Sequence, residues 1–448
     1  MGPLRLVFIF TAFAAVFVAG GVGASNATKK TVHVERVISP GGIEAWLVSD
    51  RTNPIIAVQF AFRGGASLDP SGKEGLARMA ASLLDEGAGD LDSQAFQRRL
   101  EDDAITLRFS TRRDTFTGQV GTLTENRAEA FDLLRLSLTA PRFDTEPVGR
   151  IRSQLLANLR SELEDPDVVA GLAMSAALFP GHPYGRPVDG TRESIEAITS
   201  GDLKDFFKER LALDNLVIGV VGDIGAAELG RQLDMTFDGL PKKAKPYKID
   251  DVMPRVSGAT SVIRMDVPQS AIVFAQAGVS RDHPDFFPAY VLNHILGGGG
   301  FTSRLYDQIR EKRGLAYSIG SYLYPLDHSA LILGSAGTAN KSTGETLKVL
   351  KEEWQKMAEK GTTQEELNDA KTYLTGSYPL RFTSSDRIAS ILVAMQLDDL
   401  GIDYLDRRNG YIEAVTLEAV NELAGHLIDV DKLTVVVVGK PAGVVSLP

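Results

Sequence analysis

The sequence predicts an α+β protein of two similar domains, each a mostly antiparallel sheet covered by helices. Three observations support this prediction. The chain has 448 residues, 44% of them hydrophobic, which is enough for two cores of ordinary domain size. Segments with the two-residue period of strands alternate with longer segments of helical period. Finally, the second half of the chain ends on a motif that already closes the first half.

That motif is an internal repeat. Residues 195–222 align without a gap with residues 412–439, and each copy reads as a helix followed by a buried strand. The identical pairs include Ile195/Ile412, Glu196/Glu413, Ala197/Ala414, Thr199/Thr416, Asp214/Asp431, Leu216/Leu433 and Gly222/Gly439. Two related domains therefore follow one another. The mixture of strands and helices favours α+β, although the pattern alone does not exclude an α/β arrangement.

The N-terminus predicts export. Arg5 precedes the apolar run LVFIFTAFAAVFVAG, and small residues follow as far as Ala24 and Ala27. This is typical of a cleaved secretory signal over residues 1–27, with cleavage after Ala24 or Ala27 and no membrane attachment afterwards. A retained membrane anchor is the alternative reading. The expected location is the periplasm or the exterior of a bacterium.

Composition excludes several classes of function. The net charge of -10 and the isoelectric point near 5.3 argue against a nucleic-acid partner, because phosphate binding needs a basic surface. The chain has no cysteine, so it can form neither disulfides nor thiolate metal sites nor a cysteine nucleophile.

The N-terminal domain is expected over residues 32–240. It opens with strands at 32–37, 43–48 and 55–62, followed by a turn-rich loop at 63–75. A helix is then expected over 75–87, with Leu76, Met79, Ala80, Leu83 and Leu84 on one face. The same period places Arg78, Ala81 and Ser82 together on the opposite face.

A proline- and lysine-rich stretch at 241–256 predicts an exposed linker, and residues 257–448 form the expected C-terminal domain. Strands near 261–267 and 271–279 lead to a helix at 286–296 and then to Gly297, Gly298, Gly299 and Gly300. A second helix should start at Phe301 or Thr302 and end at Gly314. From Leu315 a strand is expected, with Tyr317, Ile319, Ser321 and Leu323 on one face. A strand near 330–336, helices at 343–360 and 363–374, the interrupting segment YPLRF at 378–382 and a terminal strand at 433–438 complete the domain.

The run SRLYDQIREKRGLAYSIGSY, with Arg310 and Tyr317 seven apart, resembles the second-domain segment of the M16 family of zinc peptidases, the pitrilysin and mitochondrial-processing-peptidase group. The HPYG loop near His182 is similar to the family as well, and His182 is expected to shape that loop. The resemblance implies a two-domain subunit. It also implies that Arg310 and Tyr317 contact the backbone of a substrate opposite a zinc ion held by a partner.

The resemblance further implies that this chain holds no zinc. Active members carry H-x-x-E-H on the first long helix, where the histidines bind zinc and the glutamate is the general base. Arg78, Ala81 and Ser82 stand at those three positions. Ala157 and Asn158 stand where the third ligand is expected, and Glu162 and Glu164 read as solvated carboxylates. The histidines at 33, 182, 283, 294, 328 and 426 include no pair at ligand spacing.

We therefore expect the non-metal-binding subunit of a heterodimeric zinc metallopeptidase, inactive alone and paired with an H-x-x-E-H subunit that acts on unstructured peptides. Arg310 and Tyr317 are the expected catalytic residues in trans, and Gly297 to Gly300 are expected to contact substrate. Other readings stay open. Arg310 can simply complement a helix C-terminus, Tyr317 can be a strand aromatic, and the glycines can serve a tight turn or close packing. A non-enzymatic peptide-binding or scaffold protein of the same fold is the alternative function.

Overall fold

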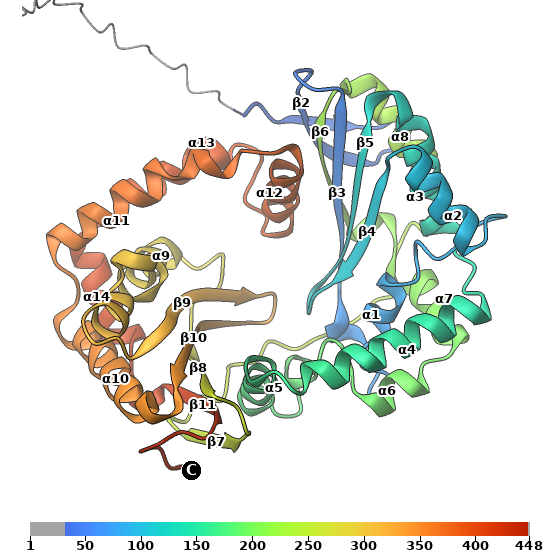
Figure 1. Cartoon of the computed structure of the whole chain (residues 1–448). Coiled ribbons are helices and arrows are strands. Elements are labelled where there is room, and N and C mark those ends of the chain that lie inside the picture. The colour runs from blue at the N-terminus through green and yellow to red at the C-terminus, as the bar shows by residue number, and fades with distance from the viewer. Residues whose placement is uncertain (1–31, 447–448) are drawn as a thin grey trace, which may run out of the picture. The chain divides into compact units, whose positions relative to one another are not determined.

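Two β-sheets, each with helices against it, make up the structure, a computed structural model that describes residues 32–446 (Figure 1). The predicted signal at 1–27 lies outside the described residues. The first sheet has the order β1-β2-β6-β3-β5-β4 and the second the order β7-β11-β8-β10-β9. Their strands are β1 Glu35–Ile38, β2 Glu44–Ser49, β3 Ile55–Arg63, β4 Thr106–Thr111, β5 Thr115–Leu123, β6 Leu216–Gly222, β7 Thr260–Arg264, β8 Gln269–Ala277, β9 Ala316–Leu326, β10 Ser329–Ala339 and β11 Thr434–Gly439.

The two sheets share one topology. The strands β2 to β6 and the strands β7 to β11 can each be counted from one to five along the chain. In both sheets the strands then lie side by side in the order first, fifth, second, fourth, third. Each sheet has one parallel pair, β2 with β6 and β7 with β11, and its other pairs are antiparallel. The predicted fold class, two similar domains with mostly antiparallel sheets, is confirmed.

The helices follow the same division along the chain. Eight belong to the segment before β7: α1 Leu76–Ala81, α2 Ser93–Asp102, α3 Arg127–Thr139, α4 Thr145–Glu162, α5 Pro166–Leu178, α6 Arg192–Ala197, α7 Ser200–Arg210 and α8 Ala226–Phe237. Six follow β8: α9 Phe286–Asn293, α10 Thr343–Lys360, α11 Gln364–Gly376, α12 Ser385–Leu397, α13 Tyr404–Glu413 and α14 Leu417–Leu427.

Residues that are identical in the two copies of the repeat serve the same structural purpose. Thr199 and Thr416 are the N-caps of α7 and α14, and the side chain of each accepts a hydrogen bond from the backbone N–H three residues on. Gly222 and Gly439 end β6 and β11 with φ of 139° and 147°, a conformation that other residues rarely adopt. The repeat thus specifies where each helix starts and where each strand ends.

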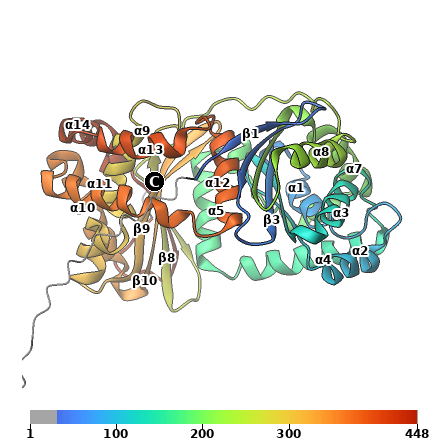
Figure 2. The same cartoon turned by 90° about the horizontal axis from the view of Figure 1, so that it is seen from above.

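Each sheet is also packed against one helix that comes from the opposite half of the sequence. Helix α12 lies against β3 and β6 of the first sheet, where Trp46, Val221, Ala389, Leu392 and Met395 form a buried cluster (Figures 1 and 2). Helix α5 packs on β8 and β11 of the second sheet in the same way. From Val34 onward the described chain forms one compact unit, and this exchange of helices explains why.

The segment 241–256 contains no helix or strand and is largely exposed. It is nevertheless held in place, because Val252 N–H donates to the carbonyl of His328 at 2.9 Å and Arg255 N–H donates to that of Leu178 at 2.8 Å. The division into domains at 32–240 and 257–448 stays a prediction.

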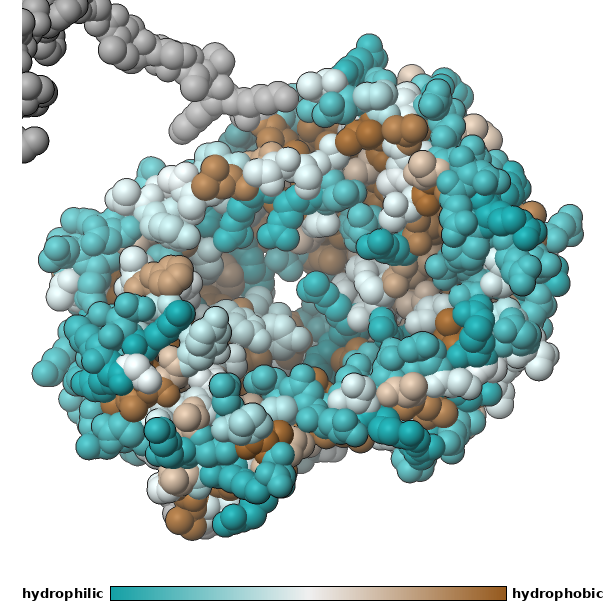
Figure 3. Space-filling model, viewed as in Figure 1, coloured by the Kyte–Doolittle hydropathy of each residue, from teal (hydrophilic) through white to brown (hydrophobic). Residues whose placement is uncertain are grey.

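The surface of the described residues is mostly hydrophilic on the face shown in Figure 3, with apolar side chains in small separate groups. Within residues 32–446, no helix combines the length and the apolar character needed to cross a bilayer.

Candidate functional site

Helix α1 carries the positions that the resemblance assigns to the zinc motif, and it is shorter than predicted. It ends at Ala81, and Ser82 is its C-cap, whereas the periodicity predicted a helix over 75–87. The chain turns here through hydrogen bonds that each span three residues, from Leu83 N–H to Ala80 O and from Glu86 N–H to Leu83 O. The apolar residues of the predicted face stay buried, so the pattern identified the buried face correctly and the length wrongly.

Arg78, Ala81 and Ser82 form no metal site. The Nε atom of Arg78 lies 3.3 Å from Oδ1 of Asp189, so a fixed cation with its own counter-ion stands where the first ligand would be. Ala81 is buried and has no proton acceptor. The Ser82 hydroxyl donates to the carbonyl of Arg78 at 3.1 Å. Zinc needs neutral imidazoles or anionic ligands, and these three side chains offer neither.

The position expected for a third ligand is also without an acid. Asn158 on α4 accepts a hydrogen bond from Gln154 at 2.9 Å, and Ala157 is exposed. Glu162, one turn further, has a raised pKa because it is desolvated and lies near Asp189, with Arg78 acting in the opposite direction. Among residues 32–446, no three histidine, aspartate or glutamate side chains are grouped so that they could hold a metal ion.

Asp69 fixes the start of α1. Its carboxylate is 3% exposed and accepts hydrogen bonds from the N–H groups of Gly75 and Ala77 at 3.0 and 3.2 Å. Burial raises its pKa to about 7, against the opposing effects of these bonds and of Arg210. The helix therefore begins on a carboxyl group that gains a proton near neutral pH.

This pKa predicts a pH-dependent stability. The folded state holds the proton of Asp69 more tightly than the unfolded chain, so the free energy of unfolding should fall as pH rises from about 4 to about 7. Asp69→Asn removes this term. We expect the free energy of unfolding of wild type, taken relative to that of the variant, to fall by roughly 2 kcal/mol between pH 5 and pH 7.5, measured by urea unfolding. Exposed Asp102→Asn is the control, and an unchanged difference would contradict the assignment.

His182 shapes the loop after α5, as expected. Its Nδ1 accepts from the N–H of Tyr184 at 3.2 Å, and its Nε2 lies 3.0 Å from the carbonyl oxygen of Asp250 in the 241–256 segment. It thereby links two irregular segments that are far apart in the sequence.

The four glycines lie in a distorted helix end and not in an open loop. Helix α9 widens into a π-helical turn, His294–Gly298, closed by a bond from Gly299 N–H to His294 O at 2.8 Å. Gly297 is buried, and a β-carbon on it would lie 2.4 Å from Oγ of Ser321. Gly300 has φ +57° with open space around it. Close packing explains Gly297. The assignment of Gly297 to Gly300 to substrate contact stays a prediction.

Gly297→Ala should therefore destabilise the fold. The added methyl group must displace Ser321, and overpacking of this kind typically costs about 1–3 kcal/mol. The control is Gly376→Ala at the end of α11, where a β-carbon meets nothing within 4 Å. Equal unfolding midpoints for the two variants in urea would refute the packing argument.

Arg310 and Tyr317 lie together, and a second aromatic residue, Tyr306, also contacts Arg310. Arg310 belongs to a second π-helix, Tyr306–Glu311, and its guanidinium carbon lies 5.2 Å from the ring centroid of Tyr317 and 4.8 Å from that of Tyr306. Within residues 32–446, no carboxylate or hydrogen-bond acceptor is paired with the Arg310 guanidinium. Its donors are therefore available to a bound molecule, while the two rings hold the cation by cation–π attraction.

A β-bulge exposes Tyr317, contrary to the prediction that it shares a face with Ile319. Gly337 of β10 pairs with Ser318 but the next residue, Thr338, pairs with Ala316, so Tyr317 is an extra residue in β9. Ala316 and Ile319 are buried, whereas Tyr317 is 77% exposed. Bulges redirect a side chain in this way and are common next to functional sites.

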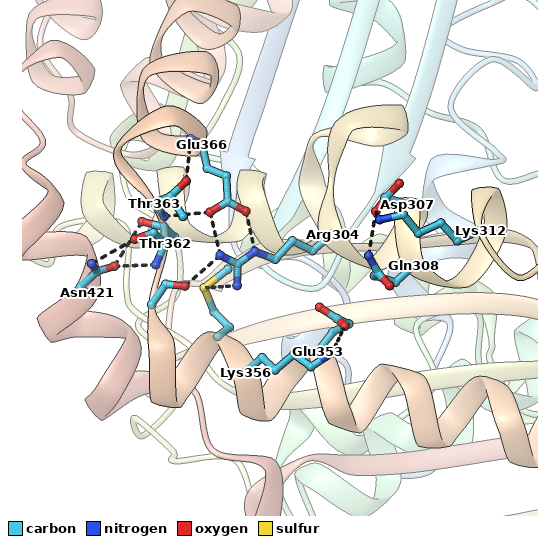
Figure 4. A network of polar contacts seen from close by, with 12 residues as sticks. Arg304, Asp307, Gln308, Lys312, Glu353, Lys356, Thr362, Thr363, Glu366 and Asn421 are labelled. Atoms are coloured by element: carbon cyan, nitrogen blue, oxygen red, sulfur yellow. Dashed lines mark hydrogen bonds and ion pairs between the residues drawn. The ribbon is translucent and has the colours of Figure 1, made fainter.

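Two residues of this site were missed from the sequence. Tyr306 is buried with a phenol that has no hydrogen-bond partner among the described residues, and its only sequence signal is the spacing of four from Arg310. Arg304 ties the segment before the second π-helix to the segment 361–366. It donates to both carboxylate oxygens of Glu366 at 2.6 and 2.7 Å and to the carbonyl of Gly361 at 2.9 Å (Figure 4). Arg304 and Arg310 thus differ in kind, one paired and one free.

Comparison with known proteins gives one consistent result. Residues 197–374 match the family described as "Peptidase M16 inactive domain". The chain is 31% identical over 391 residues to "Non-peptidase homolog YmxG" of Helicobacter pylori, covering 86% of this chain and 89% of that protein. It is 25% identical over 309 residues to "Uncharacterized zinc protease YmxG" of Bacillus subtilis, covering 69% and 75% of the two chains.

Solved structures agree with this result. The crystal structure of a peptidase M16 inactive domain from Pseudomonas fluorescens superposes with a TM-score of 0.85 at 29% identity, covering 93% of this chain and 99% of that one. A protease from Helicobacter pylori superposes with a TM-score of 0.81 at 19% identity, covering 91% and 99%, which supports the fold.

Proposed function

Because this chain belongs to the peptidase M16 family, we propose that it is the zinc-less subunit of a two-chain peptidase and supplies Arg310 and Tyr317 to the substrate. One observation carries the proposal: the Arg310 guanidinium has no acidic partner in the described chain and lies against the exposed ring of Tyr317. A fixed cation with free donors beside an exposed phenol is suited to peptide carbonyl groups.

The partner in this proposal is an M16 chain with an intact H-x-x-E-H motif. A zinc ion on that partner would activate the attacking water. Arg310 and Tyr317 would donate hydrogen bonds to the carbonyl oxygen on which negative charge develops, and one such donor is typically worth about 3 kcal/mol. Both donors act without changing their protonation state, since an arginine stays charged and a neutral phenol donates its proton in a hydrogen bond.

The location of Tyr317 suggests how a peptide is held. Strand β9 is an edge of the second sheet, as β4 is of the first. An extended peptide can add to such an edge as a further strand, which suits unstructured substrates. We further propose, from the N-terminal sequence, that the chain is exported to the periplasm or beyond.

The second candidate function is a peptide-binding or scaffold protein without any catalytic partner. The Arg78–Asp189 pair is compatible with it, because a salt bridge stands where the resemblance places the first zinc ligand. The name of the Helicobacter pylori relative, "Non-peptidase homolog", is in line with it as well.

One experiment separates the two functions. The chain is purified alone and together with an M16 chain that carries H-x-x-E-H, and bound zinc and cleavage of an unstructured peptide are measured for each. We expect no stoichiometric zinc and no cleavage for this chain alone, and cleavage by the pair above that of the partner alone. If the pair is no faster than the partner, the scaffold function is favoured. Stoichiometric zinc and proteolysis by this chain alone would refute both.

A further inference from the structure

A small cavity in the second half of the chain has a charge that nothing in the described structure balances. It has a volume of about 240 Å³ and lies between α9, α12, α13 and the YPLRF segment that interrupts the helices at 378–382. Arg281, Arg381 and Arg408 line it together with one acid, Asp398. Three arginines against one aspartate leave two positive charges in excess.

Arg408 is the central observation. It is only 5% exposed, yet its hydrogen bonds go to neutral groups. They are the carbonyl of Leu374 and the side chain of Asn409, both at 3.0 Å, and the phenol of Tyr290 at 3.5 Å. Its guanidinium carbon lies 4.0 Å from the ring centroid of Tyr378. In the part of the chain that the structure describes, no carboxylate forms an ion pair with it. A buried cation is costly without an anion, and stacking on a ring compensates for only part of that cost.

The two other arginines of the cavity differ in whether a carboxylate neutralises them. Arg281 is satisfied: its Nε lies 3.6 Å from Asp398, its Nη2 donates to the phenol of Tyr404 at 2.9 Å, and its guanidinium lies over Phe286. Arg381 is exposed and, within residues 32–446, has no carboxylate partner. The excess charge is therefore that of Arg408 and Arg381.

The walls of the cavity restrict the kind of anion. Phe286, Phe287, Tyr290, Tyr378 and Tyr404 contribute rings to the lining. A free inorganic anion would leave these surfaces without contact. The volume is below the roughly 300–1,000 Å³ of pockets for drug-sized ligands, so the occupant must be small.

We propose that this cavity binds a small organic carboxylate, with the carboxylate between Arg381 and Arg408 and an aromatic or apolar group among the rings. The planar fork of a guanidinium matches the two oxygens of a carboxylate. The proposal does not depend on a peptidase role, because the cavity shares no residue with the Arg310 site.

Occupancy of the cavity has a consequence for the rest of the molecule. Helix α12 forms one wall of the cavity and also packs on β3 and β6 of the first sheet. A ligand that binds only the folded chain stabilises it by RT ln(1 + [L]/Kd), which grows with the logarithm of the ligand concentration once that exceeds the dissociation constant. Ligand binding should therefore also raise the unfolding temperature.

The test uses phenylacetate as the probe and isothermal titration calorimetry on residues 28–448, the chain without its predicted signal. Phenylacetate should bind with a dissociation constant on the order of 1 mM or tighter, and neutral phenylacetamide at least about tenfold more weakly. Arg381 is exposed, so Arg381→Gln leaves the core intact and should weaken phenylacetate binding by about tenfold or more. Arg387→Gln, an exposed arginine on α12 outside the lining, should bind as wild type does.

Three results would overturn the proposal. The first is that phenylacetate produces no heat and no rise in unfolding temperature at concentrations several times the expected dissociation constant. The second is that Arg381→Gln binds phenylacetate as tightly as Arg387→Gln does. The third is that inorganic phosphate binds as tightly as phenylacetate, which would assign the site to any anion and not to an organic acid.

Discussion

Replacing Arg310 with alanine is expected to slow peptide cleavage by the proposed two-chain enzyme about a hundredfold, with zinc content and assembly unchanged. The reason is electrostatic. Removing one preorganised donor from a developing oxyanion typically costs about a hundredfold to a thousandfold in kcat. Arg310 has no acidic partner in the described chain, so its loss breaks no ion pair in the fold. The measurement is kcat and KM for an unstructured peptide under saturating partner.

Arg313→Ala is the matched control. Arg313 lies three residues further on, is exposed, and donates to the backbone and side chain of Gln308 at 2.6 and 2.8 Å. It carries the same charge near the same site, so long-range electrostatics alone would affect both variants equally. Equal rates for Arg310→Ala and Arg313→Ala would contradict a direct role for Arg310.

Tyr317→Phe isolates the phenol hydroxyl. The ring and its contact with Arg310 remain, so only a hydrogen bond to the substrate is lost, and kcat should fall by about tenfold or more. Tyr322→Phe on the same strand, where Tyr322 is 49% exposed, should have wild-type kinetics. A rise in KM at constant kcat would instead indicate that Tyr317 holds substrate and transition state equally.

The sequence predicted the fold because the information is local and is given twice. Thr199 and Thr416 cap helices through their own side chains, and Gly222 and Gly439 end strands through their own backbone conformations. Such signals need no knowledge of distant partners. The exchange of α5 and α12 between the sheets was not predictable, since helical periodicity identifies an apolar face but not the surface it will meet.

The candidate site was only partly predictable for the same reason. The bulge at Tyr317 arises from the register between β9 and β10, which is a property of two strands and not of one. Alternation along β9 alone places Tyr317 with Ile319, on the wrong face. The π-helical turns at 294–298 and 306–311 likewise follow from tertiary packing against β9 and α10, and a period of 3.6 cannot reveal them.

The second large effect is expected for Arg304→Met, a change that should destabilise the fold by about 2 kcal/mol. Fully buried ion pairs cost about 3–5 kcal/mol when one partner is removed. The side chains of Arg304 and Glu366 are 19% and 30% exposed, so water screens part of that loss. Urea unfolding measures the effect, and Arg313→Met, which removes an exposed arginine nearby, should change stability by less than about 0.5 kcal/mol.

The position of Arg304 gives this variant a second expected consequence. Figure 4 shows Arg304 reaching from the start of the π-helix to the junction of α10 and α11, where Glu366 also accepts from the N–H of Thr363 at 2.8 Å. Asn421 of α14 accepts from the adjacent Thr362 N–H at 2.7 Å. Arg304 therefore fixes the segment that carries Arg310, and Arg304→Met should lower the cleavage rate of the pair by less than Arg310→Ala does. A variant as stable as wild type would show that the Glu366 contacts do not anchor this segment.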